Sequence, residues 1–385
     1  MTKPDALLLT PVIPVPEGSG LKLRAWAWLK ELSSRYNVHV IVFGQPGVAA
    51  APESLAASVG FVPVRPPEER RWRRRLAKLL PFIVCWRGFG SDWPQVASDA
   101  DVAKLLDGLE PEAIIVFRLY LHDAVHPVLE RFTHARTDVD IDDFESRTRL
   151  SIALAHWRLG RWRSAIHELA LSVQYVVAEQ LLTRRYDHIH VAAPEDRLPL
   201  AKRTRAEVTV FPNRLAPPRR LPRHHPTRLL FVGSLDYPPN ELAAHWLMEM
   251  AAPLRARLPD LLPTIIGRRP DDVLRQRLGR CDGLEFIEDA TDLAPYYGAA
   301  AAVLVPLRAG GGTKLKTIEA FAHARPVIST REGVRGLGGV AEEHYLLAET
   351  TTEFVDAIER LTGDPLLAQR IGRAGYSLWR DRYSL

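Results

Sequence analysis

The residues best suited to chemistry lie in segment 305–329, where a short apolar run leads into a helix-length stretch. Three consecutive glycines, Gly310 to Gly312, let the backbone approach a ligand closely. Thr313 is a good N-cap for the helix that we expect next. Free N–H groups at a helix start bind anions, and Lys314 stands beside them. The segment therefore predicts a site for a diphosphate.

Helical spacing sorts the side chains that follow the glycines. Leu315, Ile318 and Phe321 share one face, which we expect to pack on a sheet. Lys316 and Glu319 lie three residues apart on a neighbouring stripe. The carboxylate of Glu319 is suited to accept hydrogen bonds from sugar hydroxyls. The alternative is that Lys316 and Glu319 form only a surface ion pair, and that the glycines form only a loop.

The elements that must position these residues alternate along the chain. Short apolar runs predict strands, and their Val, Ile and Leu character indicates burial on both faces, as in a parallel sheet. The expected strands are 6–10, 38–43, 61–64, 113–117, 139–141, 188–193, 208–211, 229–233, 264–267, 284–287, 302–306, 326–329 and 345–348. Helices are expected between them, among others over 21–35, 162–184, 241–256 and 314–324. This order predicts two doubly wound α/β domains.

A basic, proline-rich segment separates the two series of strands. It follows Asn213 and contains prolines at 217, 218, 222 and 226, which favours an exposed linker. We expect domains at 1–213 and 214–374, with 375–385 as a C-terminal segment available to pack back on the first domain. Ligands of open α/β sheets bind beyond the carboxyl ends of the strands, so a cleft between the domains is the expected site.

Composition excludes several classes of protein. Hydrophobic residues make up 46% and charged residues 25% of 385, which excludes a disordered or fibrous chain. No apolar run is long enough to span a membrane, and the N-terminus lacks the apolar core of a signal peptide. Cys85 and Cys281 cannot form a disulfide framework or a zinc cluster. With so few cysteines, we expect the reducing cytoplasm as its compartment. A net charge of +5 is mild, so we expect no nucleic-acid partner.

Segment 305–329 resembles the donor-binding motif of the retaining glycosyltransferases of family 4, which have the GT-B fold. Other parts of that family's C-terminal domain are matched in the same order by 231–240, 264–267, 284–289 and 293–297. The resemblance covers about residues 4–384 and is most specific in 229–340. It implies two Rossmann-like domains facing a central cleft, the first binding the acceptor and the second binding the nucleotide sugar.

The resemblance also implies an activity. The family transfers a sugar, with retention and without a metal, from a nucleoside-diphosphate sugar to a hydroxyl acceptor. We expect that acceptor to be a saccharide or a lipid-linked saccharide in polysaccharide or glycolipid synthesis. The donor is a co-substrate, and we expect no other cofactor. The alternatives are a GT-B sugar-nucleotide epimerase or hydrolase, and an inactive scaffold that binds a sugar nucleotide.

The site residues that the resemblance implies depart from the family in two places. Glu319 matches the second Glu of the Glu-x7-Glu motif, which binds the nucleotide ribose, but the first Glu is replaced by Gly311. We expect backbone N–H groups of Gly311, Gly312 and Thr313 to hold the sugar or its phosphates instead. The usual basic pair after the first C-domain strand is also absent, because Ser234 and Asn240 stand there. Lys314 and Lys316 are its expected replacements.

The candidate residues fall into three groups. Those for catalysis are Lys314, Lys316, Glu319 and Asp143. Those for donor binding are Gly18, Gly20, Gly233, Ser234, Gly267, Ile287, Gly311, Gly312, Thr313 and Leu315. On the acceptor side, the candidates are Arg118 and Asp142, each of which directly follows an expected strand. The alternatives are a simple turn at Gly18 to Gly20 and helix capping by Asp142 or Asp143.

One further feature lies in segment 69–80. Trp72, Leu76 and Leu79 have helical spacing there, among five arginines and one lysine. A basic amphipathic helix with an interfacial Trp binds anionic lipid, which predicts peripheral attachment to the inner face of the cytoplasmic membrane. The alternative is a solvated helix packed on the edge of the sheet.

Overall fold

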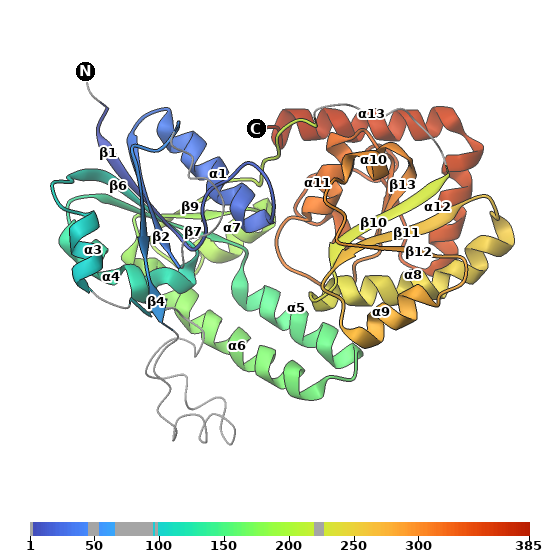
Figure 1. Ribbon diagram of the computed structural model, residues 1–385, viewed down its shortest axis with the longest axis horizontal. Coiled ribbons are helices and arrows are strands. Elements are labelled where there is room, and N and C mark those ends of the chain that lie inside the picture. The colour runs from blue at the N-terminus through green and yellow to red at the C-terminus, as the bar shows by residue number, and fades with distance from the viewer. Residues whose placement is uncertain (1–2, 45–53, 66–94, 97–98, 219–226) are drawn as a thin grey trace. The chain divides into compact units, whose positions relative to one another are not determined.

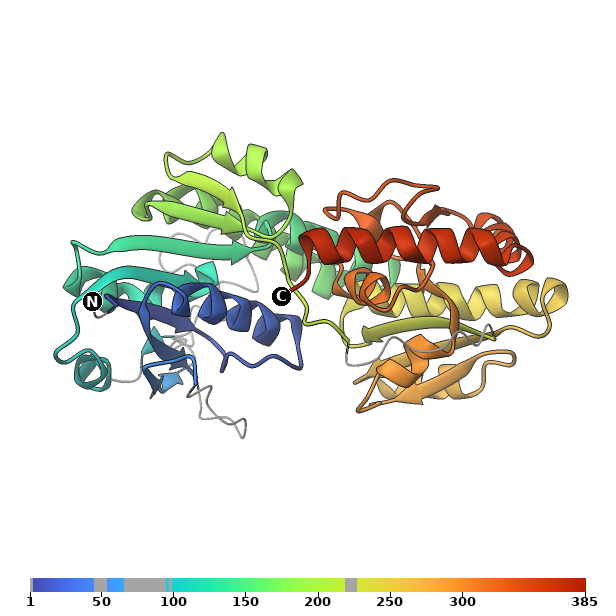
Figure 2. The ribbon, with the colours of Figure 1, turned by 90° about the horizontal axis from the view of Figure 1, so that it is seen from above.

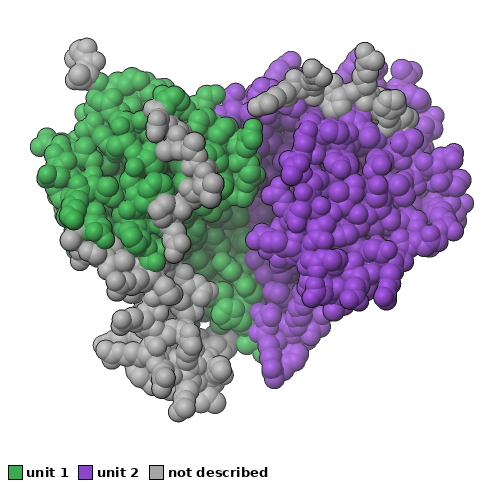
Figure 3. All heavy atoms as spheres, in the orientation of Figure 1, with its two compact units in different colours: residues 1–150, 166–214 green, residues 151–165, 215–385 purple. Residues whose placement is uncertain are grey.

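The structure is a computed structural model of the 385-residue chain. It describes residues 3–44, 54–65, 95–96, 99–218 and 227–385. These form two compact units, coloured separately in Figure 3. Unit 1 comprises residues 1–150 and 166–214, and unit 2 comprises residues 151–165 and 215–385. The chain passes between the units after Arg214 and also within two helices, α5 (Glu145–Arg158) and α6 (Trp162–Leu181).

Unit 1 is built on a parallel seven-stranded sheet in the order β3-β2-β1-β6-β7-β8-β9. Its strands are β1 (Asp5–Thr10), β2 (Asn37–Phe43), β3 (Ser58–Val62), β6 (Pro111–Phe117), β7 (Arg136–Asp142), β8 (His188–Val191) and β9 (Glu207–Val210). A small antiparallel pair adds β4 (Val64–Arg65) and β5 (Gln95–Val96). The other helices are α1 (Gly20–Ser33), α3 (Asp99–Leu105), α4 (His122–Arg131) and α7 (Pro194–Ala201). Figure 2 shows α1 and α7 on opposite faces of the sheet.

Unit 2 is built on a parallel six-stranded sheet in the order β12-β11-β10-β13-β14-β15. Its strands are β10 (Arg228–Ser234), β11 (Leu262–Arg268), β12 (Glu285–Glu288), β13 (Ala300–Val305), β14 (Val327–Ser329) and β15 (Leu346–Leu347). The helices are α8 (Pro238–Arg257), α9 (Asp272–Gly279), α10 (Ala294–Gly298), α11 (Leu315–Ala322), α12 (Thr351–Gly363) and α13 (Pro365–Arg382), shown in Figure 1. Residues 375–385 belong to this unit, where Leu215 bridges to Ser384.

The strand order confirms the predicted fold class. In both sheets the first strand is central, and later strands add first on one side and then on the other. This is the doubly wound pattern, whose ligand crevice lies where the order reverses, at β1/β6 and at β10/β13. Each apolar run that the sequence analysis assigned to a strand overlaps a strand of one of the sheets. All six residues of β13 are buried, as expected for a central parallel strand with both faces covered.

Helix signals in the sequence place the ends of several helices. In unit 2, Thr350 and Glu353 form a capping box at the start of α12, and Asp364 caps α13 ahead of Pro365. In the described part of the chain, no helix is both long and apolar enough to cross a membrane. The basic segment 69–80 lies outside the described residues.

Candidate active site

Two loops of unit 2 meet at the point where its strand order reverses. The first follows β10 and leads through Ser234 into α8; the second follows β13 and contains the three glycines that precede α11. Because β10 and β13 are parallel neighbours, their carboxyl ends lie side by side. The sequence therefore brings the glycine loop, the start of α11 and the end of β10 to one place within a single unit.

The glycine loop is held by bonds that its own residues make. Gly310 has φ 131°, a backbone conformation that side chains other than glycine rarely adopt, and its N–H donates to Ser151 Oγ at 2.7 Å. The ammonium of Lys314 donates to the carbonyls of Gly311 (2.9 Å) and Gly312 (3.1 Å). It also pairs with Glu332 at 2.9 Å. In this structure Lys314 is buried and fixes the loop from within.

The prediction that Thr313 caps the helix is wrong. The N-cap position falls on Lys314, whose side chain makes no capping bond, and α11 begins at Leu315. The bonds from the Lys314 ammonium to the carbonyls of Gly311 and Gly312 hold the loop in a non-helical conformation as far as Lys314. Thr313 itself is buried beneath the loop.

Lys316 lies opposite the end of β10, at the switch point of the sheet, which is the place where the strand order reverses. Its ammonium donates to Oδ1 of Asn240 at 2.5 Å and lies 4.5 Å from the centre of the Phe231 ring. The side-chain amide of Asn240 in turn donates to the Ser234 carbonyl at 2.8 Å, so it ties α11 to β10. Loss of hydration and repulsion from Lys314 lower the pKa of Lys316 to about 7. The binding of an anion beside this amine should therefore favour its protonation.

Glu319 lies one turn further along α11. Its carboxylate accepts a hydrogen bond from the hydroxyl of Tyr297 at 2.9 Å, and the Tyr297 ring stacks on His323 at 4.6 Å. Burial raises the pKa of Glu319, although Tyr297, Lys316 and Arg268 each act in the opposite direction. Tyr297 thus orients a carboxylate that keeps lone pairs for further donors.

Arginines from neighbouring strand ends add positive charge to this edge of unit 2. Arg268 ends β11 and is exposed. Arg269 follows it with φ 52°, pairs with Asp236 at 3.0 Å and donates to Ser234 Oγ at 3.2 Å. Arg335 donates to the Gly310 carbonyl at 3.4 Å. None of these arginines was predicted as a site residue. The available signal was the pair Arg268 and Arg269 directly after the predicted strand 264–267.

The remaining donor-side candidates serve the protein's own packing or lie elsewhere. A Cβ on Gly233 would come within 2.9 Å of the Asn240 side chain, and one on Gly267 within 2.5 Å of Leu235. These two glycines therefore make room for internal side chains. Ile287 lies on β12 and Leu315 begins α11, both half-buried. Gly18 and Gly20 belong to unit 1, at the start of α1.

The acceptor-side candidates come together at the carboxyl edge of unit 1. Arg118, after β6, pairs with Asp142 at 2.8 Å and with Glu145 at 3.2 Å. Arg118 and Asp142 both have positive φ, 88° and 58°. Such strained backbone costs of order 1–3 kcal/mol and is concentrated at functional sites. Although burial acts in the opposite direction, the carboxylates of Asp142, Glu145 and the half-buried Asp143 raise the pKa of Arg118.

A second ionic group in unit 1 was missed by the sequence analysis. Arg24 on α1 donates to both carboxylate oxygens of Asp140, at 2.7 and 2.8 Å, and to Asn213 at 3.0 Å. The indole of Trp28, one turn along α1, also donates to Asp140 at 2.5 Å. Arg24 and Asp140 are both fully buried. Arg24, the one charged residue within the otherwise apolar stretch 23–29, was the signal for this pair.

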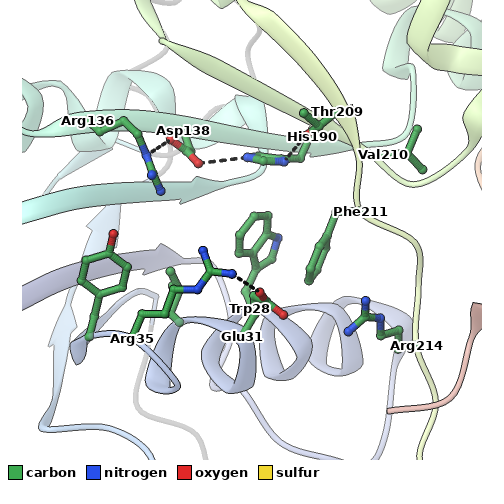
Figure 4. A pocket seen from close by; sticks show the side chains of 12 residues that line it. Trp28, Glu31, Arg35, Arg136, Asp138, His190, Thr209, Val210, Phe211 and Arg214 are labelled. Atoms are coloured by element: carbon green, nitrogen blue, oxygen red, sulfur yellow. Dashed lines mark hydrogen bonds and ion pairs between the residues drawn. The ribbon is translucent and has the colours of Figure 1, made fainter. Parts of the chain in front are cut away.

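A hollow of about 270 Å³ lies between α1 and strands β7, β8 and β9 of unit 1, as Figure 4 shows. Within it, His190 bonds to Asp138 at 3.0 Å and to Thr209 at 2.6 Å. The Trp28 and Phe211 rings stack at 4.2 Å on one wall. The sequence analysis assigned no function to these residues.

Comparison with known sequences finds two matches to part of the chain. Residues 226–364 match the model of the glycosyl transferases group 1. An uncharacterized 44.6 kDa protein in the cps region of Klebsiella pneumoniae is 28% identical over 167 residues. That match covers 41% of this chain and less than half, 43%, of the relative.

Solved structures share the fold of the whole chain at low identity. Sucrose-phosphate synthase from Thermosynechococcus elongatus has a TM-score of 0.66 at 17% identity, over 99% of this chain and 95% of that chain. TarM has a TM-score of 0.67 at 11% identity, over 100% and 97%. HepE from Anabaena, solved with UDP and glucose, has a TM-score of 0.60 at 13% identity, over 98% and 95%. The chain thus has the GT-B fold, and its residues 226–364 are similar to the glycosyl transferases group 1.

Proposed function

We propose that this protein is a retaining glycosyltransferase that takes its sugar from a nucleoside-diphosphate donor bound in unit 2. One observation carries the proposal. Lys316 and Glu319 lie at the switch point of a doubly wound sheet, at the head of α11 and beside a glycine loop. The match of residues 226–364 to the model of the glycosyl transferases group 1 supports glycosyl transfer as the reaction.

Each part of the site has a role in this proposal. Lys316 and the arginines at the strand ends neutralise the diphosphate, and Glu319, oriented by Tyr297, accepts hydrogen bonds from ribose hydroxyls. Lys314 positions the glycine loop, because its ammonium already bonds to two loop carbonyls and to Glu332. Preorganised charge at the leaving group lowers the barrier as the anomeric carbon becomes oxocarbenium-like. No metal or second cofactor is part of the proposal.

The acceptor side belongs to unit 1. We assign the acceptor hydroxyl to the neighbourhood of Asp142, Asp143 and Arg118, where backbone strain marks the end of β7 and the loop after β6. The relative in the cps region of Klebsiella pneumoniae supports polysaccharide synthesis as the setting, with a saccharide or lipid-linked saccharide as acceptor. We propose the cytoplasm as its location.

A test that needs no knowledge of the acceptor uses methanol in its place. The protein is incubated with UDP-, GDP-, ADP- and dTDP-sugars, with UDP first because HepE was solved with UDP. NMR then gives the configuration of the methyl glycoside, which does not interconvert in water. We expect the donor's own configuration in the product, and a loss of turnover in Lys316→Met.

The other outcomes separate the alternatives. A glycoside of inverted configuration contradicts retention. Isomerised donor without glycoside identifies an epimerase, and free sugar alone in the presence of methanol identifies a hydrolase. A donor that binds but is turned over neither with methanol nor with saccharide acceptors identifies a scaffold.

A further inference from the structure

Helices α5 and α6 each expose large apolar side chains along one side. The exposed residues on α6 are Trp162, Ile166, Leu169, Val173, Val177 and Leu181. Those on α5 are Leu150, Leu154 and Trp157, the last of which is 66% exposed. Steps of three and four residues keep these side chains on one side of each helix. We call this set the apolar face.

The opposite side of both helices is already packed. Within unit 1, Ser172 Oγ of α6 donates to the Ser146 carbonyl of α5 at 2.7 Å, and Arg149 donates to Glu168 at 3.3 Å. The side chains of Leu171 and Tyr175 are buried on this inner side of α6. Figure 1 shows the two helices running side by side. The apolar face is therefore surplus to what the fold needs, because a helix at a protein surface normally keeps its outer side polar.

The exposed charged residues of α5, α6 and the segment up to residue 186 all have one sign. Among residues 145–186, all of which the structure describes, the exposed charged side chains are Arg147, Arg158, Arg163, Arg184 and Arg185. Over this stretch no exposed residue is an Asp or Glu. Glu145 and Glu168 are mostly buried and pair with Arg149. Arg147 pairs with Asp196 at 3.6 Å, and the other four arginines give this surface an excess of positive charge.

We propose that this surface lies on an anionic lipid bilayer, with α5 and α6 parallel to the membrane plane. Apolar side chains would enter the acyl boundary, while the arginines remain at the level of the phosphates. Trp157 and Trp162 flank the turn between the helices and suit the headgroup layer, where amphipathic rings gather. A second copy of the chain fits less well, because a symmetric contact would bring two positively charged surfaces together.

The test uses the full chain and flotation with lipid vesicles, and it needs neither donor nor acceptor. Vesicles of phosphatidylcholine are compared with vesicles that also contain phosphatidylglycerol. We expect binding to the second kind, weakened by salt. The double variant Val173→Glu, Val177→Glu should lower the partition coefficient by about tenfold or more, because it places carboxylates against anionic lipid.

A matched control introduces the same carboxylates elsewhere. Val273 on α9 and Leu366 on α13 are 68% and 77% exposed, so Val273→Glu, Leu366→Glu should leave vesicle binding unchanged. A separate variant, Arg158→Gln, Arg163→Gln, should weaken binding to phosphatidylglycerol vesicles and reduce its dependence on salt. Circular dichroism checks that each variant is folded.

Four results would overturn the proposal. They are no flotation with either vesicle, equal binding to neutral and anionic vesicles, binding that survives Val173→Glu, Val177→Glu, and a native dimer that this variant dissociates. In the third case residues outside the apolar face, such as 69–80, carry the attachment. Loss of donor turnover without loss of flotation would count against the proposed function alone.

Discussion

At the scale of single residues, the charge of Lys316 is set by its surroundings. Asn240 offers it a neutral oxygen, and Lys314 repels it. With a pKa of about 7, the amine is mostly neutral at pH 8 in the free protein. A diphosphate beside it favours the charged form and raises this pKa again. Donor binding above pH 7 should therefore be coupled to proton uptake.

Calorimetry in two buffers with different ionisation enthalpies measures this uptake. At pH 8 we expect up to roughly one proton to be taken up for each nucleoside diphosphate bound, and far less at pH 6. Lys316→Met should abolish the uptake and weaken binding, whereas Lys104→Met, on the exposed surface of α3, should change neither. Uptake that persists in Lys316→Met would assign the proton to another group.

The residue contacts of the site are the part that the sequence predicts least. Lys316 and Glu319 could be named from the motif and their spacing, yet their partners could not. Asn240 precedes Lys316 by 76 residues, and Arg24 precedes Asp140 by 116. Such pairs form only because the sheet order places distant strand ends together, and helical or strand periodicity carries no information about them.

At the scale of elements, the loop between β13 and α11 depends on backbone that only glycine adopts readily. Gly310 has φ 131°, and Gly312 has φ 55°. Gly310→Ala should lower the free energy of unfolding by about 1–3 kcal/mol through backbone strain, and weaken nucleotide binding with it. Denaturant titration and calorimetry measure the two effects.

A second glycine provides the control for this prediction. Gly279 ends α9, and a Cβ there would meet nothing within 4 Å. Gly279→Ala should be neutral or stabilising by up to about 1 kcal/mol, without effect on binding. If Gly310→Ala behaves like Gly279→Ala, the loop geometry described here is contradicted.

Helix α6 contains a buried carboxyl group whose ionisation opposes folding. Glu179 accepts from the Ser146 N–H at 2.9 Å and from its hydroxyl at 2.7 Å, yet burial raises the pKa of Glu179 to about 7. The pKa of Glu179 is higher in the folded than in the unfolded protein, so the protonated side chain stabilises the fold. This contribution is complete below about pH 4.5 and is lost as the pH rises through 7.

Glu179→Gln should remove this pH dependence. Between pH 5 and pH 8 the native protein should lose about 2–3 kcal/mol more unfolding free energy than the variant does. Urea denaturation at both pH values measures this, with Glu130→Gln on the exposed part of α4 as a control that behaves like the native protein. Parallel losses in native protein and Glu179→Gln would show that Glu179 titrates normally.

The elements themselves were largely predictable. Central strands such as β13 are uninterrupted apolar runs, and the amphipathic spacing of α11 marks its inner face. The start of α11 was misplaced by one residue because a tertiary contact, Lys314 on the loop carbonyls, overrides the local preference of Thr313 for the N-cap. The apolar face of α5 and α6 was missed, since periodicity shows that a stripe exists but not which side the fold covers.

At the scale of the whole molecule, two doubly wound units divide the proposed work. Unit 2 provides the switch point with Lys316 and Glu319, and unit 1 provides the strained backbone at Arg118 and Asp142. A nucleotide that binds only the folded chain raises its stability by RT ln(1 + [L]/Kd), about 2.7 kcal/mol at a hundredfold excess over Kd. The identity of the base can therefore be found without knowing sugar or acceptor.

The most direct test of the donor site is calorimetric titration of the full chain with UDP, GDP, ADP and dTDP. It compares the native protein with Glu319→Gln and with the exposed control Glu130→Gln. We predict that one nucleotide binds, that Glu319→Gln weakens it about tenfold to a hundredfold through loss of charged hydrogen bonds to the ribose, and that the control does not. Binding of no nucleotide, or binding that Glu319→Gln leaves unchanged, would contradict a donor site at the switch point of unit 2.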